Sequence, residues 1–463
     1  MQNPRQDTPS PASSLLLRPF QTFFKLEAAG GVLLLVCAAA ALILANSPLA
    51  ETYFDLWQTI VTMGAGSFVI AKPLLLWIND GLMAIFFFVV GLEIKREVLV
   101  GELSSPKKAA LPLAAALGGM VVPALFYLAF NLGTDTVAGW GIPMATDIAF
   151  ALGVLALLGT RAPIALKIFL TALAIVDDLG AVLVIAFFYT AELSWVSLGL
   201  GGLFLLALIV VNRAGVRRTW VYIVLGLVLW VAFLKSGVHA TIAGVLLAMT
   251  IPARRRIDAD AFLARGLKLL DTFATGVKPG KAEPTADQRA AVHSLEVACE
   301  AIETPLARME HALHPWVAFA IMPVFALANA GVALGGDIGA ALGASVSLGV
   351  IMGLFFGKQI GVTMFSWLAV RLGWAELPAG VGWRQLYGVS LLTGIGFTMS
   401  LFIANLAFGD PAVLDQAKIG IFAASLLSGA LGWGLLRRTR PGTSAPSLDA
   451  STPDREPVAS MVE

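Results

Sequence analysis

The stretch LKIFLTALAIVDDLGAV, residues 166–182, places two adjacent carboxylates, Asp177 and Asp178, in the middle of an apolar run from Ile164 to Tyr189. A run of this length can cross the hydrocarbon core of a bilayer as a helix, which takes about 20 residues. Acidic side chains at the middle of such a helix are too short to reach water at either surface. Charges inside membrane spans are rare and by default mark a functional site, so the pair is the first candidate for one.

The composition places the rest of the chain in a membrane as well. Of its 463 residues, 58% are hydrophobic and only 13% are charged, which is outside the range of ordinary soluble domains. The formal net charge of +1 gives no indication of a nucleic-acid partner. Apolar runs of spanning length predict an all-α polytopic membrane protein with about twelve transmembrane helices. These lie near residues 28–46, 74–95, 109–131, 138–158, 164–189, 194–212, 219–235, 238–252, 315–333, 342–370, 385–408 and 417–436.

The distribution of basic residues predicts the orientation. Lys and Arg gather in alternate loops, as at Lys107 and Lys108, whereas the opposite loops carry mainly acids such as Glu51 and Asp135. Because basic residues are enriched in cytoplasmic loops, we expect both termini to face the cytoplasm.

Four segments are expected outside the twelve helices. Residues 1–24 form a cytoplasmic N-terminal tail, and residues 437–463 are too polar and too rich in Pro and Ser to pack, which predicts a disordered cytoplasmic tail. The transmembrane domain, 25–436, contains a charged cytoplasmic insert at 253–312 between spans eight and nine. Between spans one and two, Gly64 and Gly66 separate two short β-prone runs, which predicts a β-hairpin on the outer face.

Further polar residues lie inside other spans. Lys358 in GLFFGKQIG should seek a carboxylate, with Asp177 or Asp178 as its partner, unless its long stem reaches one surface. Pro143 should break the fourth span just before Thr146 and Asp147, where an acid can offset the partial positive charge of a helix N-terminus. Gly394 and Gly396 interrupt the eleventh span in the same way, and paired interruptions of this kind are typical of inverted repeats around a midplane site.

These segments resemble the NhaA family of bacterial sodium/proton antiporters over roughly residues 20–436. The likeness is carried by residues 75–97, 145–159, 166–182, 234–245, 313–331, 355–361 and 392–409. The resemblance implies a secondary active antiporter, not an enzyme. It would exchange cytoplasmic Na⁺ or Li⁺ for external H⁺ by alternating access in the bacterial inner membrane, electrogenically and without a cofactor. It also implies a homodimer formed through the hairpin near Gly64 to Gly66.

The resemblance further implies roles for single residues. Asp178 would be the principal ligand for sodium or a proton, with Asp177 beside it, and Asp147 and Lys358 would offset the half-helix dipoles where the broken spans cross, lined by Thr146. Candidates for a response to pH at the cytoplasmic funnel are charged or titratable residues of two segments: Glu93, Arg96, Glu97, Glu310, His311 and His314. A solvated charged rim accounts for each of these six residues equally well. The insert at 253–312 looks longer than the loop usual in the family, and it joins the segment that carries Glu310 and the two histidines.

Three other functions could also use charged residues inside a membrane, and the sequence offers less support for each of them. An intramembrane aspartyl protease also needs two membrane acids, but on separate helices and with a GxGD-type motif that is absent here. A sodium-coupled symporter would need a substrate pocket that no sequence feature suggests. A passive cation channel would gain nothing from Lys358 beside its carboxylates, because a fixed positive charge repels the permeant ion.

Overall fold

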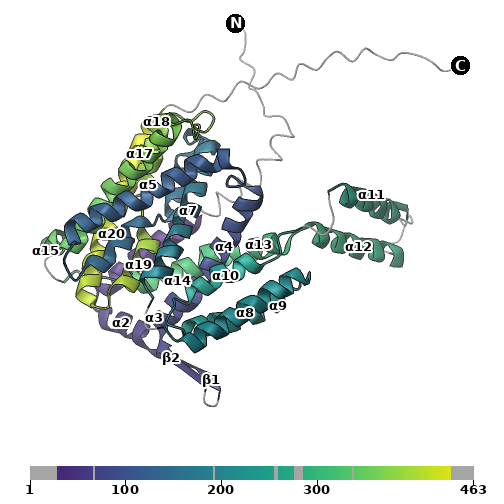
Figure 1. Ribbon diagram of the computed structural model, residues 1–463, viewed down its shortest axis with the longest axis horizontal. Coiled ribbons are helices and arrows are strands. Elements are labelled where there is room, and N and C mark those ends of the chain that lie inside the picture. The colour runs from purple at the N-terminus through teal and green to yellow at the C-terminus, as the bar shows by residue number, and fades with distance from the viewer. Residues whose placement is uncertain are drawn as a thin grey trace, which may run out of the picture.

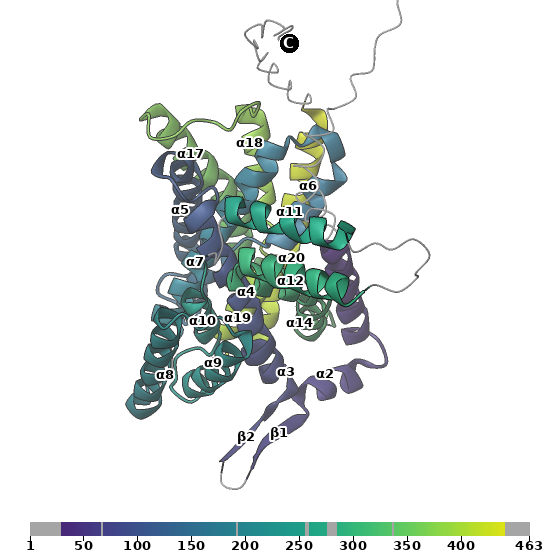
Figure 2. The same cartoon turned by 90° about the vertical axis from the view of Figure 1, so that its right-hand side faces the viewer.

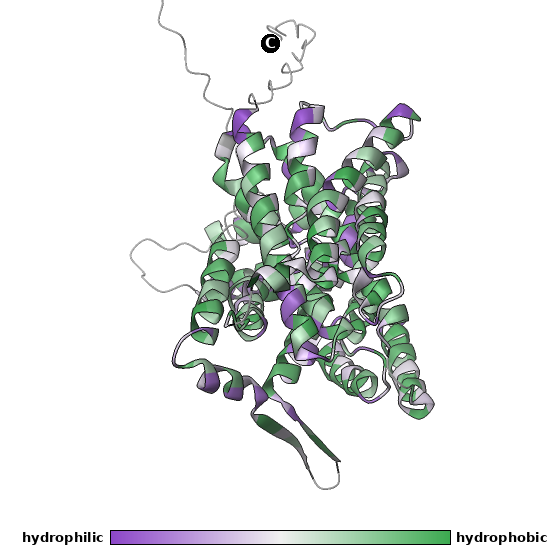
Figure 3. Ribbon diagram, turned by 90° about the vertical axis from the view of Figure 1, so that its left-hand side faces the viewer, coloured by the Kyte–Doolittle hydropathy of each residue, from purple (hydrophilic) through white to green (hydrophobic). Residues whose placement is uncertain are grey.

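The computed structural model describes residues 29–65, 68–190, 193–254, 259–275, 285–335 and 338–439. Helices run through most of these residues and pack into one bundle (Figure 1). Most residues along the helices are hydrophobic (Figure 3), as expected for a protein surrounded by lipid. The predicted N-terminal tail, 1–24, and all but the first three residues of the predicted C-terminal tail, 437–463, lie outside the described residues.

The elements follow one another along the chain as a first helix at Ala29–Ala45 and then these labelled segments. They are α2 (Ala50–Gln58), β1 (Ile60–Ala65), β2 (Phe68–Pro73), α3 (Leu74–Trp77), η1 (Ile78–Leu82), α4 (Met83–Val100), α5 (Pro106–Asn131), η2 (Val137–Met144), α6 (Ile148–Leu157), η3 (Gly159–Arg161), α7 (Ile164–Phe188), α8 (Trp195–Arg213), α9 (Thr219–Leu234), α10 (Thr241–Thr250), α11 (Ala259–Thr275), α12 (Ala286–Ile302), α13 (Pro305–Trp316), η4 (Val317–Ile321), α14 (Met322–Asn329), α15 (Ile338–Gly343), α16 (Ser345–Ile351), η5 (Met352–Gly357), α17 (Lys358–Arg371), α18 (Trp383–Leu392), α19 (Phe397–Ala407) and α20 (Pro411–Arg438).

The predicted polytopic fold is confirmed. Within the described residues, eight helical segments are long and apolar enough to cross a membrane: Leu74–Val100, Pro106–Asn131, Val137–Leu157, Ile164–Phe188, Trp195–Arg213, Pro305–Asn329, Ser345–Arg371 and Pro411–Arg438. Two bent pairs, Ala29–Ala45 with Ala50–Gln58 and Trp383–Leu392 with Phe397–Ala407, and two shorter apolar helices, α9 and α10, complete the set. Each of the twelve predicted spans therefore corresponds to a helical segment of the structure.

The predicted hairpin is also present. Strands β1 and β2 pair in antiparallel register from Ile60 opposite Pro73 to Ala65 opposite Phe68. The hairpin stands away from the bundle in two perpendicular views (Figures 1 and 2). Its turn residue Gly66 is not among the described residues. Its position on the outer face stays a prediction.

The insert between spans eight and nine contains two helices, α11 and α12, which pack against each other and project from the bundle (Figure 1). Residues 255–258 and 276–284 of this insert lie outside the described residues. Helix α12 begins with a capping box, in which Thr285 and Gln288 each bond the other's backbone N–H. The insert was predicted to end at residue 312, but α13 begins at Pro305 and continues through η4 and α14, so the last predicted insert residues belong to the ninth spanning segment.

Both predicted breaks are present, in the fourth and eleventh spans. The fourth span leaves helical geometry at Ala145, with φ −86° and ψ 145°, after Pro143, which lacks a backbone donor. The eleventh span is bent by 44° between α18 and α19. The two breaks meet, because the Asp147 N–H donates to the Ile395 carbonyl at 2.7 Å. The broken spans are the middle members of two sets of three spans, spans three to five and spans ten to twelve, in agreement with the predicted inverted repeats.

Close packing between α5 and α17 brings the tenth span against this crossing. A side chain at Gly118 would collide with the Gly361 carbonyl and with Phe365, so the two backbones touch where small residues meet. A side chain at Gly119, one residue further along, would lie 3.6 Å from Lys358 Nζ. Because glycine has no side chain, the glycines of α5 leave room for the Lys358 side chain, which extends toward α7.

Candidate functional site

The acid pair lies at the buried centre of the bundle, on α7. Asp177 is 1% exposed and Asp178 is 2% exposed. Adjacent residues on a helix point about 100° apart, and the two carboxylates accordingly have different surroundings. Asp177 faces Lys358, whereas Asp178 lines a small cavity.

Asp177 is held by two donors from other spans. Its Oδ2 accepts a hydrogen bond from the Lys358 ammonium, and both side chains of this ion pair are completely buried. The Thr146 hydroxyl lies 2.7 Å from the same oxygen and 3.0 Å from the Thr393 carbonyl. The structure therefore selects Asp177, from the two partners predicted for Lys358, and connects this pair to both broken spans.

Asp147 lies between the N-terminal ends of two half-helices. It is the N-cap of α6, where its Oδ1 accepts from the Phe150 N–H at 3.1 Å. Its Oδ2 accepts from the Thr398 N–H at 3.1 Å, in the first turn of α19, and from the Thr398 hydroxyl. Helix N-termini carry partial positive charge and unpaired N–H groups. One buried carboxylate thus accepts hydrogen bonds from the N-terminal ends of both half-helices.

The cavity beside Asp178 has a volume of about 50 Å³. A single water needs about 10–15 Å³ by the same measure, so the cavity has room for a few molecules or ions the size of water. Five polar residues line it together with Asp178: Glu93, Thr146, Asp147, His314 and Thr398. Within the described residues, Asp178 Oδ1 is buried and accepts no hydrogen bond.

The charges around Asp178 are mostly negative. Asp177, Glu93 and Asp147 repel its carboxylate, and Lys358 attracts it. Such a field favours a cation or a proton at this position. Carboxylate and hydroxyl oxygens are the ligands that hard cations prefer.

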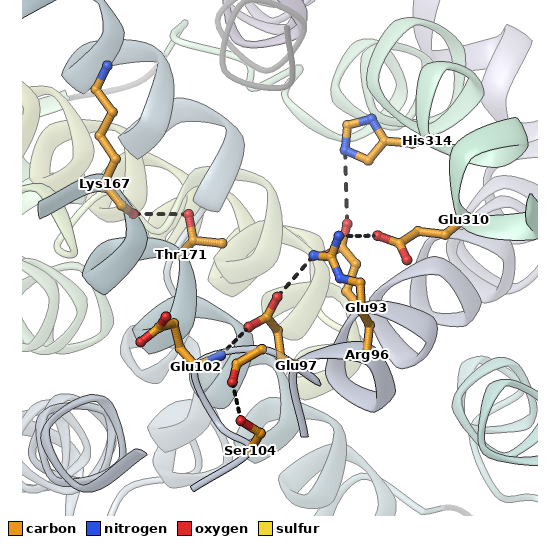
Figure 4. A network of polar contacts seen from close by, with 10 residues as sticks. Glu93, Arg96, Glu97, Glu102, Ser104, Lys167, Thr171, Glu310 and His314 are labelled. Carbon is orange, nitrogen blue, oxygen red and sulfur yellow. Dashed lines mark hydrogen bonds and ion pairs between the residues drawn. The ribbon is translucent and has the colours of Figure 1, made fainter. Parts of the chain in front are cut away.

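Five of the six residues predicted to respond to pH lie together in a network of polar contacts (Figure 4), and two of them line this cavity. Arg96 Nη1 lies 3.0 Å from Glu310 Oε1, and Arg96 Nη2 lies 3.1 Å from Glu97 Oε1. His314 Nε2 is 3.9 Å from Glu93 Oε1, and both residues also line the Asp178 cavity. The network therefore reaches the acid pair through Glu93 and His314.

His311 differs from the other five candidates. It is exposed, and its Nδ1 lies 2.9 Å from the Ala307 carbonyl of its own helix. The structure thus brings Glu93, Arg96, Glu97, Glu310 and His314 together and leaves His311 beside them on the surface of α13.

A second polar group in the second span was missed from the sequence. Asp80 Oδ2 lies 2.8 Å from Lys72 Nζ of strand β2, and its Oδ1 lies 3.6 Å from His239 Nε2. Next to it, the amides of Asn79 and Asn329 exchange hydrogen bonds at 2.9 and 3.2 Å. The signal was present, because Asn and Asp interrupt an otherwise apolar run in LLWINDGLMAIFF.

Comparison with known proteins gives matches that agree on one family. The family described as Na⁺/H⁺ antiporter 1 matches residues 21–436. The Na⁺/H⁺ antiporter NhaA of Oleidesulfovibrio alaskensis is 55% identical over 424 residues, which cover 91% of this chain and 94% of that protein. The Na⁺/H⁺ antiporters NhaA of Koribacter versatilis and Rhodospirillum rubrum are both 53% identical, with 95% and 92% of this chain covered and 95% and 98% of the relatives.

These matches extend across the transmembrane domain and include both broken spans, the acid pair and Lys358. The family consists of transporters rather than enzymes. With a family match over residues 21–436 and relatives more than half identical over nearly its whole length, this chain belongs to the Na⁺/H⁺ antiporter family.

Proposed function

We propose that this chain exchanges sodium ions for protons, expelling cytoplasmic Na⁺ or Li⁺ in return for external H⁺. The observation that carries the proposal is the asymmetry of the acid pair. Asp177 is engaged by Lys358 and Thr146, whereas Asp178 faces a cavity lined by oxygen ligands. Relatives that are more than half identical to this chain are named Na⁺/H⁺ antiporters, and this supports the same exchange here.

The exchange works by competition at Asp178. Its carboxylate holds one proton or one hard cation, and each excludes the other because both need the same oxygen lone pairs. The oxygens of Asp147, Thr146 and Thr398 are available to complete the coordination of a sodium ion. Only an occupied site then changes the side of the membrane to which it opens, so ion and proton movements are coupled.

The other buried charges support this site. Asp147 offsets the partial positive charge of two half-helix ends, which lets the backbone stay unwound within the membrane. Lys358 balances Asp177, and Thr146 links that pair to the Thr393 carbonyl at the crossing. A movement of the crossing therefore changes the surroundings of both acids at once.

The network of Glu93, Arg96, Glu97, Glu310 and His314, with His311 at its edge, adjusts the exchange to pH. What supports this role is the position of Glu93 and His314 on the same cavity as Asp178. Histidine changes its charge within the physiological range, and a charge gained at this position repels an entering cation.

The protein operates in the bacterial inner membrane with both termini in the cytoplasm, and the exchange is electrogenic. Neither a cofactor nor nucleic acid takes part. Residues 25–436 form the transmembrane domain, and the cytoplasmic insert lies between α10 and α13 within it. Two copies pair through the hairpin of β1 and β2, whose exposed side chains Ile60, Met63 and Val69 support a contact outside the bundle.

The test is exchange in proteoliposomes that enclose a pH-sensitive dye at acidic internal pH. External sodium or lithium should raise the internal pH with the wild-type chain and with Asp55→Asn, a matched change at an exposed residue. Asp178→Asn should abolish the response. Sodium-driven alkalinisation that is undiminished in Asp178→Asn would refute the proposal, and so would sodium uptake without proton movement, which a channel would give.

A further inference from the structure

A second cavity, larger than the one at Asp178, lies on the side of the bundle between the first helix, α6 and α20. Its volume is about 540 Å³, within the range of about 300–1,000 Å³ typical of pockets that take a whole small ligand. Its lining is aliphatic and aromatic apart from Ser425, whose hydroxyl accepts from the Phe397 N–H at 3.3 Å. Ile395 and Phe397 form a buried floor, while Leu157 and Leu426 at the rim are 72% and 76% exposed. The cavity is thus a groove that opens toward the surrounding lipid.

One end of this groove is positively charged. Trp433 lines the groove, and the Arg437 guanidinium lies over its ring at 5.0 Å from the centroid. The guanidinium of Arg161, four residues beyond the rim residue Leu157, donates to the Arg437 carbonyl at 2.7 Å. Both arginines are exposed, and in the described part of the chain neither lies within ion-pair distance of a carboxylate. Figure 2 shows α6 and the end of α20 side by side at this end of the bundle.

We propose that this groove binds one anionic phospholipid of the bilayer, with an acyl chain along the groove and the phosphate at Arg161 and Arg437. An apolar channel open to lipid, with two neighbouring guanidinium groups at its end, matches both parts of such a molecule. Guanidinium groups bind phosphate oxygens in a bidentate manner. Basic pockets between membrane helices are a recurrent site for anionic headgroups.

The bound chain would rest on the crossing of the two broken spans. Phe150 of α6 and Phe397 of α19 both line the groove, and their rings pack edge to face at 4.8 Å. The Phe150 N–H is also the group that Asp147 caps. A lipid in this groove therefore supports the half-helices that surround the ion site. Because it binds the folded protein, it should also raise the unfolding temperature, and the rise should grow with the logarithm of the lipid concentration once the site is saturated.

Native mass spectrometry of the full-length protein tests the headgroup end, with phosphatidylglycerol added to delipidated protein. The wild type should carry one tightly retained lipid, and Arg437→Gln should weaken its retention about fivefold, the effect of one arginine near an anionic headgroup. Arg371→Gln is the matched control, since Arg371 also ends a membrane helix and lies over a tryptophan, Trp367, at 4.9 Å, but is not at the groove. Equal retention by the two variants would overturn the headgroup assignment.

The groove is tested by filling it from α20. A side chain at Gly429 would begin 3.5 Å from Ile395, an ordinary contact, so Gly429→Leu fits and projects into the groove. Gly434 on the same helix has open space around it and does not line the groove, so Gly434→Leu is its control. We expect Gly429→Leu alone to lose the retained lipid and the lipid-dependent rise in unfolding temperature. Retention that is unchanged in Gly429→Leu would mean that the groove takes another occupant, such as a different segment of the chain, and would refute the proposal. Neither readout depends on transport.

Discussion

The buried ion pair of Lys358 and Asp177 makes a prediction whose size follows from its burial. Both side chains are 0% exposed, so Lys358→Met removes an ammonium and leaves a carboxylate in a medium that solvates it poorly. Removing one partner of a buried pair costs about 3–5 kcal/mol, whereas replacing both partners by neutral groups is often nearly neutral. We therefore expect Lys358→Met to lower stability by about 3–5 kcal/mol and the double variant with Asp177→Asn to recover most of that loss.

The assay is a double-mutant cycle by thermal unfolding in detergent at pH 8. At this pH a carboxyl that has lost its ammonium partner is least able to relieve the cost by taking up a proton. The two single variants should be coupled by more than about 1 kcal/mol, as expected for residues in direct contact. Asp178→Asn with Lys358→Met is the control, because Asp178 lies beside the pair without a hydrogen bond to Lys358. Additive losses in the Asp177 cycle, or coupling as large in the control cycle, would refute the assignment of Asp177 as the partner.

Three further predictions concern the surroundings of the pair. Thr398→Val keeps the shape of the side chain but removes the hydroxyl donor to Asp147. It should cost about 1–3 kcal/mol in thermal unfolding, and a loss no larger than that of Thr398→Ser would contradict the bond. Gly361→Leu should collide with the facing backbone of α5 and abolish folded protein in size-exclusion chromatography. A monodisperse, active variant would show that these helices can separate. Arg96→Gln leaves Glu310 without its partner at 3.0 Å, so the pH profile of exchange should shift while the maximal rate changes by less than about twofold. A profile identical to that of the wild type would exclude this pair from the pH response.

Much of the fold could be predicted because lipid imposes a simple rule. An apolar run of spanning length must form a helix, since unpaired backbone groups are costly in hydrocarbon. The short eighth span, α10, and the broken fourth and eleventh spans were predicted at their observed places by this rule together with Pro143, Gly394 and Gly396. The boundary of the insert at α13 was less predictable. Charged residues such as Arg308 and Glu310 favour a helix in water over the start of a membrane span, but Glu310 is buried against Arg96.

Part of the functional site could likewise be predicted from the sequence, and part could not. Asp177, Asp178, Asp147 and Lys358 could be found individually, because an ionisable residue is costly to keep in an apolar run and usually serves function there. Asp80 was missed although it follows the same rule, since it lies near the end of a span. Its partners come from a strand and from a loop after α9.

The sequence by itself determined which segments cross the membrane and which buried charges need a partner, because both depend on local composition and on the cost of leaving water. Only the tertiary structure decided how those charges are shared. Two carboxylates adjacent in sequence look equivalent. In the folded helix one faces Lys358, and the other faces a cavity lined by Glu93 and His314. The contact between Asp147 and Thr398 likewise joins residues 251 positions apart. Such pairings depend on how the spans cross, and span composition does not specify the crossing.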